Sequence, residues 1–90
     1  MNFDYIDKSA LYFDSACQTL RPKEVIEAVD QYYKEYNACA GRVKYKWGQK
    51  IDAVVEDTRE KILSYLDLSS KKYTVAFTLN TSYGINLVLS

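Results

Sequence analysis

Tyr73-Thr74-Val75-Ala76-Phe77-Thr78-Leu79-Asn80-Thr81-Ser82 is the stretch of this sequence that decides its fold. Residues 73–79 are rich in β-branched and aromatic side chains, which favour an extended strand. Asn80, Thr81 and Ser82 favour a turn and the start of a helix, and an apolar pattern continues from residue 84 to residue 90. A strand that leads directly into a helix is typical of α/β proteins.

Two helices are expected before this strand. Apolar residues recur at intervals of three and four over residues 22–36 and again over residues 49–66, which predicts two amphipathic helices. Charged residues, including Arg59, mostly occupy the opposite, exposed side of the second helix. Residues 11–13 predict a brief strand that runs into a loop. The main elements are therefore expected in the order helix, helix, strand, helix.

A single sheet strand cannot form a sheet. Parallel strands need neighbouring strands and crossover connections, and only one convincing sheet strand is present. The last helical pattern reaches Ser90 without a capping glycine or a basic final turn. We therefore expect the chain to be truncated relative to a larger α/β unit.

The composition of the chain limits the kinds of partner that this protein is expected to bind. Twelve basic and twelve acidic residues cancel, so no overall field attracts nucleic acid or an anionic membrane. No apolar run approaches the length of a membrane span, and residues 1–5 lack the features of a signal peptide. We expect a cytoplasmic protein with no nucleic-acid or membrane partner. There is no histidine, and Cys17 and Cys39 form no metal-binding pattern, so no metal site is expected.

Two segments could contact an anionic ligand. Residues 42–48 mix basic and aromatic side chains between the two helices, and they suit either a solvated loop or the neighbourhood of a planar anion. At Asn80-Thr81-Ser82, the unpaired N–H groups and the dipole of a helix start favour phosphate, and Thr81 and Ser82 add hydroxyl donors. Local pattern alone favours a simpler alternative, in which Thr81 or Ser82 only caps the helix.

Two ordered blocks of the sequence resemble class-V aminotransferases and cysteine desulfurases. The first block, which resembles the opening of these enzymes, consists of Tyr12-Phe13-Asp14-Ser15-Ala16, Arg21-Pro22 and Val25-Ile26-Glu27-Ala28. The second block, residues 75–88, resembles a family segment that contains Asn-Thr-Thr-Glu-Gly-Ile-Asn. The likeness extends from about residue 11 to residue 89 with matching order and spacing.

The resemblance implies the α/β fold-type-I (aspartate-aminotransferase-like) architecture of pyridoxal-phosphate enzymes, which act as dimers on amino acids. Residues 1–21 would form an N-terminal arm and substrate-side loop, and residues 22–90 would begin the large cofactor-binding domain. Thr81 and Ser82 would bind the phosphate of pyridoxal 5'-phosphate, with Asn80 as a neighbour. The candidates for the substrate side are Ala16, Cys17 and Arg42.

The sequence also departs from the family pattern. Many cysteine desulfurases carry His-Arg-Gly-x-His between the two helices, where this chain has Gly41-Arg42-Val43-Lys44-Tyr45. Aminotransferase, epimerase and lyase chemistry therefore stay open beside desulfuration. No lysine occupies the family's Ser-x-His-Lys setting, so these residues alone should not catalyse.

A non-catalytic interaction domain, or a remnant of the family, is the alternative. The isolated chain is expected to self-associate through the apolar residues 85–89 or the edges of the strand.

Overall fold

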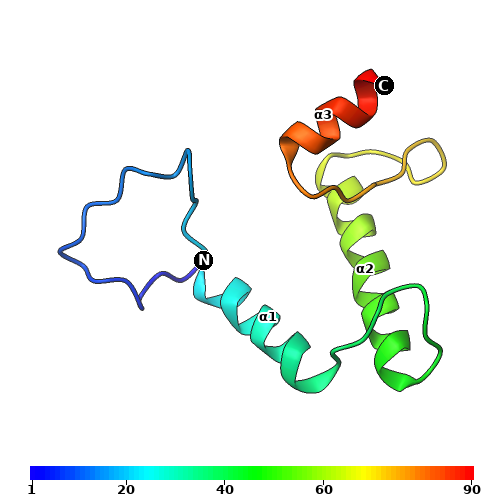
Figure 1. Cartoon of the computed structure of the whole chain (residues 1–90), viewed down its shortest axis with the longest axis horizontal. Coiled ribbons are helices and arrows are strands. Elements are labelled where there is room, and N and C mark those ends of the chain that lie inside the picture. Colours follow the sequence, from blue (N-terminus) through cyan, green and yellow to red (C-terminus); the bar gives the residue numbers. More distant parts are fainter. The chain divides into compact units, whose positions relative to one another are not determined.

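The computed structural model describes all residues from 1 to 90 and contains three helices (Figure 1). Helix α1 extends over Lys23–Glu35, α2 over Lys46–Tyr65 and α3 over Thr81–Leu89. The chain divides into two compact units, residues 1–51 and residues 52–90, and each unit is described by itself. The predicted division into residues 1–21 and 22–90 stays a prediction.

The expected strand at residues 73–79 is not formed, and neither is the brief strand at residues 11–13. The observed order is helix, helix, helix, so the chain by itself shows no α/β layers. The reason is physical: a strand is stabilised by hydrogen bonds to a neighbouring strand, and no other segment of this chain pairs with residues 73–79. Strand propensity in the side chains is not sufficient without that partner.

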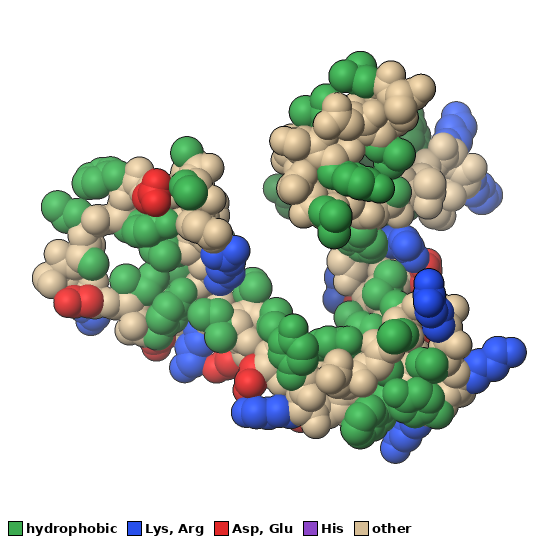
Figure 2. All heavy atoms as spheres, viewed as in Figure 1, with side chains coloured by type: hydrophobic (Ala, Val, Ile, Leu, Met, Phe, Trp, Pro, Cys, Tyr) green, Lys and Arg blue, Asp and Glu red, His purple; other side chains and the backbone are tan.

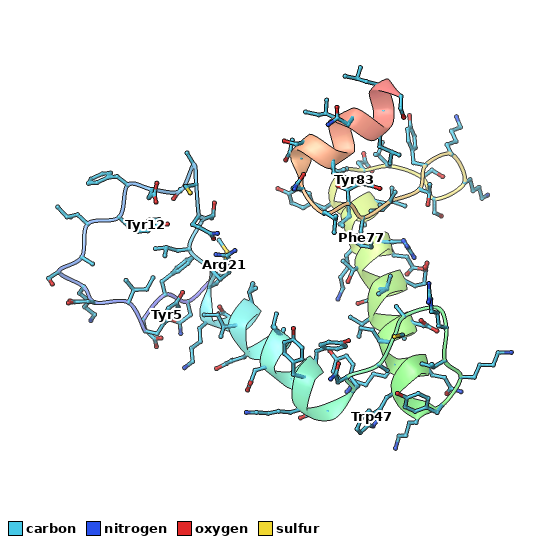
Figure 3. All side chains as sticks on the ribbon, in the orientation of Figure 1. Tyr5, Tyr12, Arg21, Trp47, Phe77 and Tyr83 are labelled. Atoms are coloured by element: carbon cyan, nitrogen blue, oxygen red, sulfur yellow. The ribbon has the colours of Figure 1, made fainter.

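Residues 1–22 form a closed loop that leads into α1 (Figure 3). The Tyr5 hydroxyl donates a hydrogen bond to the Arg21 carbonyl, and the Tyr12 hydroxyl donates one to the Gln18 carbonyl. The Asn2 carbonyl accepts the Lys23 N–H at 2.7 Å, which satisfies one of the unpaired donors at the start of α1. The loop therefore takes the place of a side-chain cap, which Pro22 does not supply.

A small buried cluster lies at the end of α1. Tyr36 and Ala38 are only 7% and 9% exposed. The Tyr32 ring meets the Tyr36 ring edge-on at 5.4 Å, and the Tyr32 hydroxyl donates to the Ala38 carbonyl at 3.0 Å. The Lys50 ammonium lies 4.5 Å from the centre of the Tyr36 ring. The predicted apolar stripe of α1 therefore ends in packed tyrosines.

Helix α2 begins at Lys46, whereas the sequence pattern predicted a start near Gln49. The first bond of the helix, from the Gln49 N–H to the Tyr45 carbonyl at 3.0 Å, accounts for the earlier start, and Gly48 lies in this first turn. A Cβ atom at this position would lie 2.4 Å from both Cγ2 and the carbonyl oxygen of Val43. Because glycine has no Cβ atom, Val43 can pack directly on the first turn of α2. Since α2 begins at Lys46, Trp47 belongs to the helix and not to the preceding loop.

Helix α2 ends in a Schellman motif. The Leu68 N–H donates to the Leu63 carbonyl at 2.9 Å, and the Asp67 N–H donates to the Ser64 carbonyl at 3.1 Å. This pair of bonds requires left-handed backbone at Asp67, which has φ of 56°. Leu63, two residues before the end of α2, is 7% exposed. The motif turns the chain back toward the second half of α2.

Most large hydrophobic side chains are exposed. Tyr36, Ala38 and Leu63 are the buried hydrophobic residues, whereas Ile85, at 54% exposure, is typical of α3. Figure 2 shows hydrophobic side chains over α3 and over the N-terminal loop. No helix combines the length and the apolar character that a membrane span requires.

Gly48→Ala is expected to destabilise the protein, although alanine is the better helix former. The added methyl group would overlap the Val43 carbonyl, which is backbone and cannot rotate away, so a loss of about 1–3 kcal/mol in the free energy of unfolding is expected. Gly84→Ala is the control, because its methyl group would lie 3.3 Å from the rotatable Thr78 hydroxyl. Equal losses for both variants in urea denaturation would contradict the steric explanation.

Asp67→Gly is expected to raise the free energy of unfolding by about 0.5–1 kcal/mol, since glycine adopts left-handed backbone without the steric cost that a Cβ atom brings. Ser70→Gly is the control. Ser70 does not have positive φ, so glycine there only adds freedom to the unfolded chain. The explanation fails if the two variants change the thermal midpoint in the same direction.

Attachment of the N-terminal loop to α1 is expected to depend on pH. The Glu24 amide and the Asn2 N–H, which lies 3.1 Å from the Glu24 carboxylate, lower the pKa of Glu24. The stabilisation is present above the ordinary glutamate pKa of about 4.3 and is lost as the pH falls through the lower folded-state value. Amide exchange at Asn2 measures the loss. Glu24→Gln should remove this pH dependence, and Glu27→Gln should retain it.

Candidate functional site

Asn80 determines where α3 begins. Its backbone is extended, with φ of −167° and ψ of 176°, and its side-chain oxygen accepts the Tyr83 N–H at 2.8 Å. The first bond within the helix follows, from the Gly84 N–H to the Asn80 carbonyl at 3.0 Å. The alternative in which Thr81 or Ser82 caps the helix was therefore wrong, because Asn80 is the N-cap.

This cap leaves four donors available at Thr81 and Ser82. Their N–H groups precede the first bond within the helix, so they have no helical acceptor. Their hydroxyl groups take no part in the cap, and both residues are exposed. The helix dipole adds partial positive charge at the same place. Residues 68–90 contain two lysines and no acidic residue, so no nearby carboxylate in the sequence opposes an anion.

Thr78 and Gly84 shape the turn before the helix. The Thr78 hydroxyl donates to the Asn80 carbonyl at 3.2 Å. A Cβ atom at Gly84 would lie 3.3 Å from that hydroxyl oxygen, which is a tight contact. Glycine at this position therefore lets the Thr78 side chain lie against the first turn of α3.

Arg59 of α2 contacts the segment that leads into this turn. Its Nε–H donates to the Val75 carbonyl at 3.0 Å, and its guanidinium carbon lies 5.4 Å from the centre of the Phe77 ring. Figure 3 shows Phe77 beside α2. The sequence pattern had placed Arg59 on the exposed side of its helix. The one feature of the sequence that could have indicated this contact is that residue 59 is arginine and not lysine. Only a guanidinium can both donate in its plane and stack on a ring.

The substrate-side candidates lie in the first unit. Ala16 and Cys17 are exposed in a turn in which the N–H groups of Cys17 and Gln18 both donate to the Asp14 carbonyl, at 3.0 and 2.9 Å. The Cys17 thiol is free. Arg42 is exposed and follows Gly41, which has left-handed backbone with φ of 74°. The structure brings Ala16 and Cys17 together, and no hydrogen bond joins Arg42 to either of them.

The donors at the start of α3 are suited to holding a phosphate group. Backbone N–H and hydroxyl groups at a helix N-terminus bind phosphate oxygens, and no carboxylate is present in this turn to bind a cation in their place. The chain has no histidine, so the turn has no neighbouring imidazole to act as an acid or a base. The arrangement can therefore bind and orient an anion.

Comparison with known proteins agrees with both sequence blocks. Residues 11–90 match the family model described as Aminotransferase class-V. A probable cysteine desulfurase of Methanothermobacter thermautotrophicus is 37% identical over 78 residues, which are 87% of this chain and 19% of that protein. A probable cysteine desulfurase of Borreliella burgdorferi is 33% identical over 90 residues, which are 100% of this chain and 21% of that protein.

A third relative, the cysteine desulfurase SufS of Plasmodium falciparum, is 37% identical over 82 residues, which are 91% of this chain and 15% of that protein. The chain thus spans about a fifth of the length of the first two relatives. No solved structure matches it. Because the family model covers residues 11–90 and so includes both blocks, the chain belongs to the class-V aminotransferase family.

Proposed function

We propose that this chain is the N-terminal part of a pyridoxal-phosphate enzyme that acts on an amino acid, and that the start of α3 binds the phosphate of the cofactor. The observation that carries the proposal is the cap at Asn80. Its side-chain oxygen takes the Tyr83 N–H and leaves the donors of Thr81 and Ser82 for a ligand. When bound, pyridoxal 5'-phosphate supplies an electron sink for reactions at the amino acid.

Each residue of the turn has a separate role. The N–H groups of Thr81 and Ser82 donate to phosphate oxygens, and their hydroxyls add two further bonds to the same charged group. Hydrogen bonds of this charge-assisted kind are stronger than neutral ones. The Asn80 side-chain oxygen is already bonded, so its amide nitrogen is the side-chain donor that it can still offer. The turn thereby orients one end of the cofactor.

The substrate side of the proposal concerns Ala16, Cys17 and Arg42. An exposed guanidinium at Arg42 suits the carboxylate of an amino acid, which it can bind through two parallel hydrogen bonds. The names of the relatives favour cysteine as the amino acid. Gly41 and Tyr45 stand where many desulfurases have histidine, so transamination, epimerisation and lyase reactions stay open beside desulfuration. The family resemblance further supports a homodimer.

A second candidate function is a non-catalytic interaction domain derived from the same family. The observation that favours it is the exposure of the apolar side chains on α3, such as Val88 at 84% and Leu89 at 78%. Exposed apolar surface of this kind is typical of a face that another polypeptide covers. An interaction domain need not bind the cofactor, so cofactor binding separates the two functions.

Titration with pyridoxal 5'-phosphate, and separately with pyridoxal, tests the proposal directly. The amide resonances of Thr81 and Ser82 are expected to move with the phosphorylated compound and to stay in place with pyridoxal, because the turn recognises phosphate. Equal movement with both compounds would show that the turn does not read phosphate. No movement, with the Gly84 amide still protected as part of an intact helix, would overturn the proposal.

Two substitutions give this test its controls. Ser82→Ala removes one hydroxyl donor to a charged group, worth about 1.5–3 kcal/mol, so affinity for pyridoxal 5'-phosphate should fall roughly 10- to 100-fold. Asn80→Asp keeps a good N-cap residue but adds negative charge, so α3 should persist while affinity falls. Ser64→Ala, at an exposed position of α2, should leave the affinity unchanged.

A further inference from the structure

We propose that Arg59 is a positioning residue for the phosphate-binding turn, which it fixes by holding residues 75–77 against α2. The significance of the turn rests on the function proposed above. The contacts of Arg59 can be tested without it. No part of the proposal requires Arg59 to touch the ligand, because each of its contacts is to another residue of this chain.

The single side chain of Arg59 makes contacts with three different residues. Its Nε–H donates to the Val75 carbonyl at 3.0 Å, its guanidinium carbon lies 5.4 Å from the centre of the Phe77 ring, and its terminal nitrogen pairs with Glu56. A guanidinium can do all three at once, since it is planar and carries five donors in fixed directions. A lysine ammonium lacks that plane.

The exposure of the side chains separates Arg59 from its charged neighbours on α2. The Arg59 side chain is 33% exposed, whereas that of Lys61 is 75% exposed and pairs with Asp57 one turn away. Lys61 thus has the ordinary position of a charge on a solvated helix face. Arg59 is partly covered, and Val75, to which it donates, is itself half-buried.

The bond to Val75 is important because residues 73–79 have no strand partner. The neighbouring hydrogen bonds are local: the N–H groups of Lys72 and Tyr73 donate to the Ser69 carbonyl, and the Thr78 hydroxyl donates to the Asn80 carbonyl. Arg59 therefore supplies the hydrogen bond that joins this segment to α2. This bond takes the place of one backbone hydrogen bond that a neighbouring strand would supply.

A short series of contacts connects Val75 to the phosphate-binding turn. Thr78, three residues later, bonds to the Asn80 carbonyl and lies against Gly84. Asn80 then caps α3 through the Tyr83 N–H. Only two residues separate Val75 from Thr78 along the chain, so the bond to Arg59 and the contacts of Thr78 are neighbours in the sequence. Releasing Val75 should therefore loosen the place where Thr81 and Ser82 are held.

Arg59→Lys tests this role, because it keeps the charge and the pairing with Glu56 but removes the Nε–H bond and the planar contact. Hydrogen exchange at the Tyr83 amide, which reports the cap, should become about tenfold faster, as expected for losing one hydrogen bond of ordinary strength. Amides within α2 should keep their protection. Affinity for pyridoxal 5'-phosphate should fall about tenfold, and affinity for pyridoxal should stay the same.

Three further variants keep the test decisive. Glu56→Gln removes the ion pair and should leave Tyr83 exchange unchanged, since the role depends on position and not on charge. Lys61→Gln is the matched control for loss of a charge from α2 and should have no effect. Phe77→Leu removes the ring but keeps the bond to Val75, so it should accelerate exchange by less than Arg59→Lys, and it serves if Arg59→Lys does not fold.

Unchanged Tyr83 exchange in both Arg59→Lys and Phe77→Leu would overturn the positioning role. Equal acceleration in α2 and at Tyr83 would also overturn it, because that result describes general destabilisation. A third outcome separates the two proposals. If Arg59→Lys accelerates exchange at Tyr83 but the wild-type protein responds equally to pyridoxal 5'-phosphate and pyridoxal, the positioning role is supported and the proposed cofactor site is rejected.

Discussion

The hydrogen bond from the Tyr83 N–H to the Asn80 side chain is the interaction on which the candidate site depends. Without it, the start of α3 could move by a residue, and Thr81 or Ser82 would have to use its hydroxyl as the cap. With it, the helix begins at a defined residue and two consecutive residues keep both their N–H and hydroxyl donors. One side-chain oxygen thus fixes the start of the helix and leaves the donors of Thr81 and Ser82 out of the cap.

The other helix boundaries are also set by single local features. The backbone of Asn2 closes the start of α1, the absence of a Cβ atom at Gly48 admits Val43 to the first turn of α2, and left-handed backbone at Asp67 ends that helix. The buried hydrophobic side chains are few. Helix ends and short contacts between neighbouring segments therefore carry a large share of the order in each unit.

The sequence predicted what depends on local periodicity and on order along the chain. The spacing of apolar residues alone predicted the amphipathic helices α1 and α2. The two blocks around Asp14 and Thr81 indicated the family, which the family model confirms. The strand at residues 73–79 could not be predicted correctly, because a strand depends on a partner that no propensity describes. Arg59 was missed for a related reason: which segment lies against a helix face is not encoded in the period of that helix.

The division of tasks between Asn80 and its two successors has a consequence for how this segment can vary among relatives. If Thr81 and Ser82 bind the ligand as proposed, the main task of position 80 is to cap the helix, so serine, which also caps a helix well, should be accepted there. Positions 81 and 82 would be constrained by the proposed ligand, and they should then accept exchange between serine and threonine but little else. A relative that has lost the ligand should therefore drift at 81 and 82 first, while position 80 continues to carry a capping residue.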